Sequence, residues 1–234
     1  DTQNRGGTTT RVGSRKRKHR IVKVGHGGTL DPLATGVLAI GVGSGTKQLQ
    51  SYLTGPKGYF ARAEFGFETD TLDMGGNVTK RAPFDHISNT KEQIEEVLPK
   101  FTGTIQQIPP IYSAIRKGGK RLYDQARAGK TAEELNLEPR EVHVHQLNLL
   151  DATDSTFDID MQCGGGTYVR ALVRDIAYEL DTLATTTVLT RTQHGPFDQS
   201  SVLEKEDWNA DNIYAQIERF AALEQADDDE PKKP

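Results

Sequence analysis

Two segments of the chain alternate apolar and polar residues with a period of two, which is the pattern of strands that bury one face. They are residues 59–67 and residues 157–163. After the second segment, apolar residues recur every three or four positions from Val169 to Leu180, which predicts an amphipathic helix. Because strands and helices are mixed without a regular strand–helix–strand rhythm, the sequence favours an α+β fold over a doubly wound α/β fold.

Weaker patterns place the remaining elements. The apolar run at residues 36–41 fits a buried strand, and residues 46–53 fit a short helix after a glycine-rich turn. The later helix is expected to begin at a Thr167 cap. Further elements are expected as helices at residues 90–101 and 122–128 and as a strand at residues 141–150.

Composition excludes several classes of protein. No run of about 18 apolar residues is present to form a membrane span, and no apolar signal segment opens the chain. The single cysteine, Cys163, excludes an internal disulfide and a cysteine-based zinc cage, and we interpret it as a buried packing residue. A length of 234 residues allows one large domain or two small ones. Since the chain starts at Asp1 without a methionine, we expect it to be a fragment.

Charge is unevenly distributed along the chain. The net charge is −4, which by itself argues weakly against a nucleic-acid ligand, but residues 1–24 carry +7 and the remainder −11. We expect residues 1–20 to be a basic, disordered arm and residues 221–234 to be an acidic tail. Its basic cluster predicts either a nuclear localisation signal or a segment that contacts RNA. The alternative is a solvated basic arm without a specific partner.

Two patterns are set aside as sites. Residues 41–47, GVGSGTK, follow an expected strand, but Thr46 stands where a dinucleotide loop needs its third glycine, and the spacing is wrong for a P-loop. A nucleotide-dependent enzyme is therefore a poor alternative. His143 and His145 point to one face of a strand, but no nearby third ligand completes a metal site.

The stretch GHGGTLDPLATGVL at residues 25–38 is more specific. Without further information it predicts an Asp-Pro turn, or an active-site loop, because loops held by rigid elements concentrate functional groups. It closely resembles the catalytic motif of the TruB family of pseudouridine synthases. Residues 57–76 resemble the family's tyrosine strand, residues 107–129 its basic RNA-gripping insertion, residues 163–177 its arginine motif, and residues 188–191 a shortened leucine–arginine segment that closes the pocket.

The resemblance covers about residues 23–191 and implies both fold and activity. The implied fold is a pseudouridine synthase catalytic domain over residues 21–220, with a central mixed, largely antiparallel sheet flanked by helices and a basic insertion at about 109–141. The implied activity is isomerisation of uridine to pseudouridine in RNA. Because nothing is oxidised, reduced or lost in this reaction, neither a cofactor nor a metal is needed.

By residue-by-residue match, the implied catalytic residues are Asp31, Tyr59 and Arg170. Asp31 stabilises charge on the sugar or attacks the substrate, by the logic of a glycosidase carboxylate. Arg170 supplies a bidentate partner for Asp31, and Tyr59 packs on the uracil and assists removal of the C5 proton. Without the resemblance, the sequence would predict only that Arg170 is an arginine on the surface of a helix and that Tyr59 is a strand residue whose side chain faces the core.

Further residues of the match concern the RNA. His26 is assigned to RNA remodelling rather than proton transfer, with a purely structural histidine as the alternative. The wider substrate pocket comprises His26, Thr29, Tyr168 and Leu189. The expected phosphate contacts are Arg116, Lys117, Lys120, Arg121 and Arg127.

The family's usual substrate, uridine 55 in the T-arm of tRNA, makes tRNA the expected partner of a monomeric enzyme. His-Gly-Gly at residues 26–28 is similar to the eukaryotic branch, some members of which also modify mRNA, and an intracellular site in nucleus, mitochondrion or cytoplasm is expected. Two departures from many bacterial members are the missing opening Lys-Pro-x-Gly segment and the absence of an evident C-terminal RNA-binding domain. A tRNA-folding chaperone on the same scaffold is the alternative function, although the joint presence of Asp31, Tyr59 and Arg170 argues against an inactive paralogue.

Overall fold

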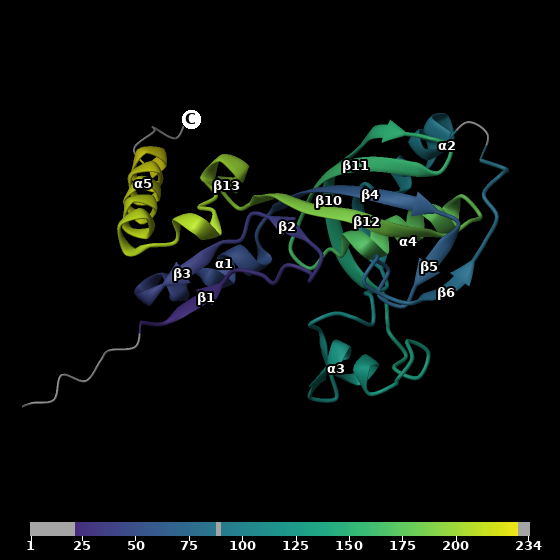
Figure 1. Cartoon of the computed structure of the whole chain (residues 1–234), viewed down its shortest axis with the longest axis horizontal. Helices are drawn as coiled ribbons and strands as arrows, with labels where there is room; N and C mark the ends of the chain where they lie inside the picture. The colour runs from purple at the N-terminus through teal and green to yellow at the C-terminus, as the bar shows by residue number, and fades with distance from the viewer. Residues whose placement is uncertain (1–21, 88–89, 229–234) are drawn as a thin grey trace, which may run out of the picture.

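The computed structural model describes residues 22–87 and 90–228, and a seven-stranded sheet forms its centre (Figure 1). The expected basic arm therefore lies outside the described residues. Every pairing in this sheet is antiparallel except that of β2 with β12, which confirms the expected mixed, largely antiparallel sheet. The sheet order is β13 (Phe197–Asp198), β12 (Ala184–His194), β4 (Lys57–Phe65), β11 (Thr156–Cys163), β10 (Arg140–Ala152) and β7 (Gly103–Gln107), with β2 (Thr35–Gly36) beside β12.

The two alternating segments form adjacent strands at the centre of this sheet. In β4 and β11, Ala61 pairs with Ile159 and Ala63 with Phe157, and all four side chains are buried. Helix α4 (Val169–Glu179) packs its apolar stripe against this face. The apolar residues that recur every two positions in the strands and every three or four in the helix thus predicted the core. Both spacings place the apolar side chains on one face of the element.

Helices α4 and α2 (Thr90–Val97) flank the sheet, and η2 (Leu98–Phe101) continues α2. The expected cap of α4 was wrong by one residue. The helix follows Tyr168, and the Thr167 hydroxyl donates instead to the Gly164 carbonyl. Residues 46–53 form two elements rather than one, η1 (Gly43–Lys47) and α1 (Leu49–Thr54).

The expected single strand at residues 36–41 was also wrong. The segment contributes to β2, passes through an irregular stretch, and then enters β3 (Ile40–Val42), which pairs with β1 (Val24–His26). Val37 and Ala39 are buried in the irregular stretch. Their backbone N–H groups donate to the Arg191 carbonyl and to His194 Nδ1, so tertiary partners replace a strand ladder here.

Several elements had no counterpart in the sequence predictions, among them strand β12 and helix α5. Strand β12 carries no clean apolar alternation because several of its buried positions are polar or basic, including Thr185, Arg191 and His194. Helix α5 (Ala210–Asp228) lies beside β13, and it continues past residue 220 into the segment expected to be an acidic tail. The small two-stranded sheet β5–β6 pairs Phe67–Thr69 with Val78–Arg81.

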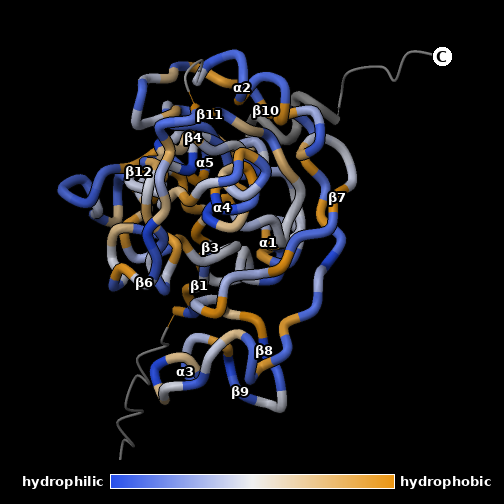
Figure 2. Tube along the Cα trace, turned by 90° about the vertical axis from the view of Figure 1, so that its right-hand side faces the viewer, coloured by the Kyte–Doolittle hydropathy of each residue, from blue (hydrophilic) through white to orange (hydrophobic). Residues whose placement is uncertain are grey.

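The chain between β7 and β10 forms a separate lobe, which we call the insertion (residues 108–139). It lies apart from the sheet in both views (Figures 1 and 2). Arg140, expected within the insertion, belongs instead to β10, and so does Glu141, with which the predicted strand at residues 141–150 begins. The elements of the insertion are β8 (Arg116–Lys117), β9 (Lys120–Arg121) and α3 (Leu122–Arg127). Within the described residues, no helix has the length and apolarity that a membrane span requires.

Candidate active site

Asp31 lies at a tight turn in the loop between β1 and β2. The Asp31 carbonyl accepts a hydrogen bond from the Ala34 N–H at 3.0 Å, with Pro32 in the second position of the turn. The turn leads into β2, where Thr35 pairs with Thr190 of β12. The Asp-Pro turn predicted from sequence therefore fixes Asp31 beside the central sheet.

Arg170 meets Asp31 from the first turn of α4. Its Nε donates to Asp31 Oδ2 at 2.7 Å, although the two residues are 139 positions apart. The Arg170 side chain is 3% exposed and that of Asp31 is 31% exposed. In this ion pair the guanidinium is therefore buried, whereas the carboxylate remains accessible from solvent.

The expected bidentate pairing of Arg170 with Asp31 was wrong. The remaining guanidinium nitrogens are occupied: Nη1 donates to the Thr71 carbonyl and lies 3.6 Å from Asp73 Oδ2, and Nη2 donates to the Tyr112 carbonyl at 3.1 Å. Arg170 is therefore fixed by three segments at once, and only Nε serves Asp31. Asp73, which sequence analysis did not single out, is a second carboxylate at this cation.

Tyr59 approaches the site from β4. Burial raises the pKa of its phenol to about 12, with the nearby Asp31 carboxylate adding to the rise and the Arg191 guanidinium opposing it. Leu189 is buried and pairs with Ala61, two positions along β4 from Tyr59. Side chains two positions apart share a face of a strand, so Tyr59 and Leu189 lie on the same side of the sheet.

Tyr168 precedes α4 and is held by a buried glutamine. The Gln107 side chain accepts from the Tyr168 N–H at 2.8 Å and donates to the Tyr168 carbonyl at 3.1 Å. Burial raises the pKa of the Tyr168 phenol, and the charge of Asp31 contributes to the rise. The charge of Asp31 thus acts on three other predicted residues of the site, which are Tyr59, Tyr168 and Arg170.

Arg191, at 1% exposure, braces the loop that carries Asp31. Its Nε donates to the Val37 carbonyl at 2.6 Å and its Nη2 to the Gly28 carbonyl at 3.2 Å. These carbonyls lie on either side of Asp31 in the sequence, so one guanidinium joins the two ends of the loop. Gly36 has φ +99°, and a Cβ there would lie 2.2 Å from the Arg191 carbonyl oxygen, which explains one glycine of the motif.

His194 and Lys57 complete the buried support. Burial, reinforced by Arg191, lowers the pKa of His194 to about 4, so its ring is neutral at pH 7. Nδ1 accepts from the Ala39 N–H and Nε2 contacts the Tyr52 carbonyl at 3.1 Å, which places the proton on Nε2. Lys57 Nζ donates to three carbonyls at the end of α1, and burial lowers its pKa.

Other predicted residues are placed differently. His26 is the last residue of β1 and Thr29 lies in the loop of Asp31. Both are exposed, and within the described residues their side chains make no hydrogen bond or ion pair. Cys163 is buried and unpaired, as expected, and burial raises its pKa to about 11. Over residues 22–87 and 90–228, no group of three or more His, Cys, Asp or Glu is arranged to hold a metal ion.

The five predicted phosphate contacts all lie exposed on the insertion. Arg121 and Arg127 both lie over the Tyr123 ring, with guanidinium carbons 5.6 and 5.4 Å from its centre. Arg121 Nη1 also donates to the Tyr123 hydroxyl at 2.6 Å, and the other guanidinium N–H groups of this exposed pair suit contacts with phosphates. The others lie in the hairpin and are Arg116, Lys117 and Lys120.

Comparison of the sequence with known proteins finds one family model and several relatives that match this chain. Residues 16–169 match the N-terminal domain of TruB family pseudouridylate synthase. Pseudouridylate synthase TRUB1 is 46% identical over 209 residues in both Mus musculus and Homo sapiens, covering 89% of this chain and 61% and 59% of those proteins. The chain thus spans about three fifths of their length. tRNA pseudouridine synthase B of Bordetella avium is 44% identical over 78% of this chain and 73% of its own.

Comparison of structures agrees on the fold. A chain in the crystal structure of a Cbf5-Nop10-Gar1 complex matches with a TM-score of 0.57 and 25% identity, over 79% of this chain and 44% of that one. A chain of an archaeal box H/ACA sRNP Nop10-Cbf5 complex matches with a TM-score of 0.55 and 23% identity, over 83% of this chain and 49% of that one. The second likeness bears on the fold alone.

Proposed function

Because the chain belongs to the TruB family of pseudouridine synthases, we propose that it isomerises uridine to pseudouridine in RNA. In this reaction the bond from C1′ of the ribose to N1 of the base breaks, and a bond from C1′ to C5 forms. C5 loses a proton and N1 gains one, so the product is an isomer. The observation that carries the proposal is the contact between Asp31 and Arg170, since it joins an accessible carboxylate to a buried cation.

Asp31 acts on the charge that develops at the sugar. Cleavage of the glycosidic bond makes C1′ electron-poor, and a carboxylate beside it stabilises that charge or attacks it. Arg170 keeps the carboxylate oriented, because its other nitrogens are fixed by backbone carbonyls of two further segments. The geometry thus supplies a preorganised anion that needs no rearrangement during the reaction.

Tyr59 acts on the base. Its ring offers a flat surface for the uracil, and its phenol stays protonated at neutral pH because its pKa is about 12. A phenol with so high a pKa is a weak source of phenolate for removing the C5 proton. The Arg191 guanidinium, which opposes the rise in pKa, lowers the cost of forming that phenolate.

The proposed substrate is uridine 55 in the T-arm of tRNA, with mRNA uridines in similar stem-loops as further substrates and a monomer as the active form. The uridine must leave its stack to reach Asp31, at a cost of about a few kcal/mol. Contacts from the exposed cations of the insertion to phosphates offset this cost without reading sequence. His26, exposed at the end of β1 where the loop of Asp31 begins, contributes to RNA remodelling.

The test is pseudouridine formation in a T-arm stem-loop by the 234-residue chain, compared with Asp31→Asn. The substitution keeps the shape of the side chain and removes its charge. We expect stoichiometric pseudouridine with the wild type and none detectable with Asp31→Asn, while both proteins bind the RNA. Binding and refolding of tRNA by the wild type without pseudouridine would instead support a folding chaperone and refute an enzyme.

A further inference from the structure

Gln107 is a polar residue enclosed in the core beside the start of α4. It is the last residue of β7, pairs with Arg140 of β10, and is 1% exposed. Glutamine is rarely buried to this extent unless its amide finds hydrogen-bond partners. Here both ends of the amide serve one residue, because Oε1 accepts from the Tyr168 N–H at 2.8 Å and Nε2 donates to the Tyr168 carbonyl at 3.1 Å. The Gln107 side chain therefore takes the place of a strand partner for Tyr168.

The start of α4 depends on this contact, because the side chain at its N-cap does not fix it. Tyr168 precedes the helix with extended backbone angles, φ −106° and ψ 109°, and its side chain makes no capping hydrogen bond. The Tyr168 carbonyl also accepts from the Leu172 N–H at 3.0 Å, so one oxygen joins the first turn of the helix to the glutamine. Two hydrogen bonds from one planar amide fix direction as well as distance, since each prefers a nearly linear geometry.

The direction of this first turn decides where Arg170 points. Arg170 lies two residues after Tyr168, and its Nε donates to Asp31 Oδ2 at 2.7 Å. A rotation of the Tyr168 backbone would move this nitrogen relative to the carboxylate. Misplacing a catalytic group by about 1 Å costs about 100-fold in rate. A residue that holds Tyr168 thus has a direct effect on the contact between Arg170 and Asp31.

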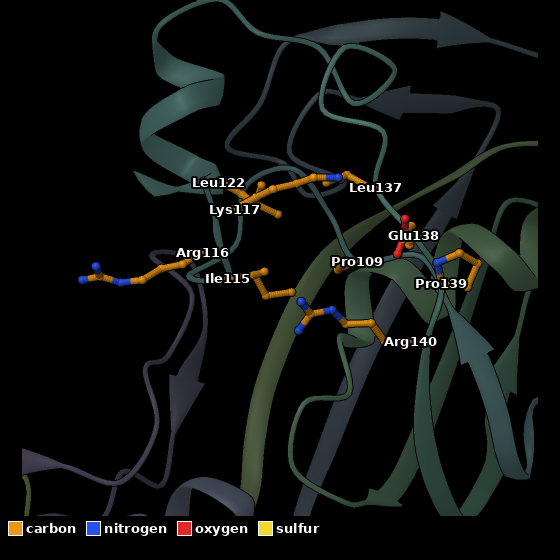
Figure 3. Close-up of a pocket in the computed structure, with 9 residues that line it drawn as sticks. All are labelled: Pro109, Ile115, Arg116, Lys117, Leu122, Leu137, Glu138, Pro139 and Arg140. Carbon is orange, nitrogen blue, oxygen red and sulfur yellow. The ribbon is translucent and has the colours of Figure 1, made fainter. Parts of the chain in front are cut away.

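The chain that follows Gln107 is stiff and contacts α4 again. Pro109 and Pro110 restrict the backbone of this connection. Figure 3 shows Pro109 at the root of the insertion, at the wall of a cavity of about 220 Å³. Further along the same connection, the Tyr112 carbonyl accepts from Arg170 Nη2 at 3.1 Å. The connection therefore holds the start of α4 at two points, and Gln107 is the one that is anchored in the sheet.

We propose that Gln107 is a positioning residue of the active site, which fixes the Tyr168 backbone and thereby directs the Arg170 guanidinium at Asp31. The proposal rests on the proposed function, because it takes Arg170 and Asp31 as groups of that reaction. Gln107 is buried away from the substrate and acts only through its neighbours. Its substitution should therefore change kcat and not the affinity for RNA.

Gln107→Glu tests this role, because it keeps the shape of the side chain and makes its hydrogen bonding depend on pH. A protonated carboxyl donates to the Tyr168 carbonyl and accepts from the Tyr168 N–H, whereas a carboxylate has no proton to donate. Burial should raise the pKa of the introduced carboxyl, so that both forms are reached between about pH 5.5 and pH 9. We expect kcat of the variant relative to the wild type to fall about 10- to 100-fold as pH rises across this range. KM for the T-arm stem-loop should change by less than about two-fold.

The position of Arg170 can also be measured without turnover. The NMR resonance of its Nε–H, assigned by its loss in Arg170→Lys, reports the contact with Asp31. In Gln107→Glu this resonance should move with pH over the same range as kcat, and in the wild type it should not. Gln107→Met fills the same space without either hydrogen bond, so its kcat should be low and its Arg170 resonance displaced at every pH.

The matched control is Gln106→Glu, at the neighbouring exposed position on the other face of β7. It should equal the wild type in kcat, KM and the Arg170 resonance when all proteins are measured well below their melting temperatures. The positioning role is refuted if kcat of Gln107→Glu relative to the wild type is constant with pH, or if Gln107→Met loses thermal stability but keeps kcat and the Arg170 resonance. If the resonance moves as expected but the wild type forms no pseudouridine, the positioning role stands and the proposed function fails.

Discussion

Arg191 pairs directly across the sheet with Tyr59, and its guanidinium also holds the Gly28 and Val37 carbonyls at the ends of the loop that carries Asp31. Two candidate catalytic groups, from β4 and from the loop, therefore depend on one buried side chain of β12. Neither Asp31 nor Tyr59 is positioned by its own segment alone.

We expect Arg191→Lys to lower kcat by about 10- to 100-fold, because an ammonium cannot span both carbonyls and a small displacement of Asp31 is costly. KM for the stem-loop should change by less than about two-fold, since Arg191 is buried away from the RNA. Steady-state kinetics well below the melting temperature provide the measurement. Arg62→Lys, at an exposed arginine of β4, should leave kcat unchanged; equal losses in kcat and RNA affinity would argue for general unfolding instead.

Arg170→Lys should reduce kcat by about 100-fold, the usual cost of removing one preorganised electrostatic group. A lysine cannot reach Asp31, the Thr71 carbonyl and the Tyr112 carbonyl together. Single-turnover pseudouridine formation provides the measurement. The matched control is Arg174→Lys, one turn later on α4, which donates to the Ile108 carbonyl and should retain activity within about three-fold. Equal losses in both variants would contradict a specific role for Arg170.

His194 should make the protein sensitive to acid. Its pKa is about 4 in the folded protein and 6.5 in its ordinary state, so the unfolded chain binds a proton that the folded chain does not between these values. The free energy of unfolding should therefore fall as pH decreases from 6.5 toward 4. Urea titrations across this range provide the measurement. His194→Gln keeps a donor and an acceptor without titrating, so its stability should vary less with pH, whereas His145→Gln on the exposed face of β10 should behave as the wild type.

The insertion should contribute to RNA affinity through phosphates. Lys120→Ala or Arg121→Ala should each reduce the slope of log K against log salt concentration by about 0.7–1, the value expected for one released counterion. Anisotropy titrations at several salt concentrations give the slope. Lys91→Ala, at an exposed position of α2 and outside the insertion, should leave the slope unchanged. An unaltered slope in both insertion variants would remove these residues from the RNA interface.

The sequence determined the central part of the fold because local periodicity reports which face of an element is buried. The alternation in β4 and β11 and the stripe of α4 each needed only neighbouring residues to be recognised. Strand β12 was not recognised, since Arg191 and His194 are buried there by their hydrogen bonds and not by apolar character. The segment around Val37 is apolar and buried, but it does not form the expected strand, because its hydrogen-bond partners lie more than 150 residues away in the sequence.

For the candidate site, the motif of residues 25–38 identified the loop of Asp31, and resemblance named Tyr59 and Arg170. Sequence could not specify how Arg170 divides its nitrogens among Asp31, Asp73 and two backbone carbonyls, or that Arg191 braces the loop. Residue types and spacing determine which groups are available for chemistry. Only the packing of distant segments decides which of these groups meet, because charge and hydrogen-bond partners are set by proximity in space and by the burial that comes with it.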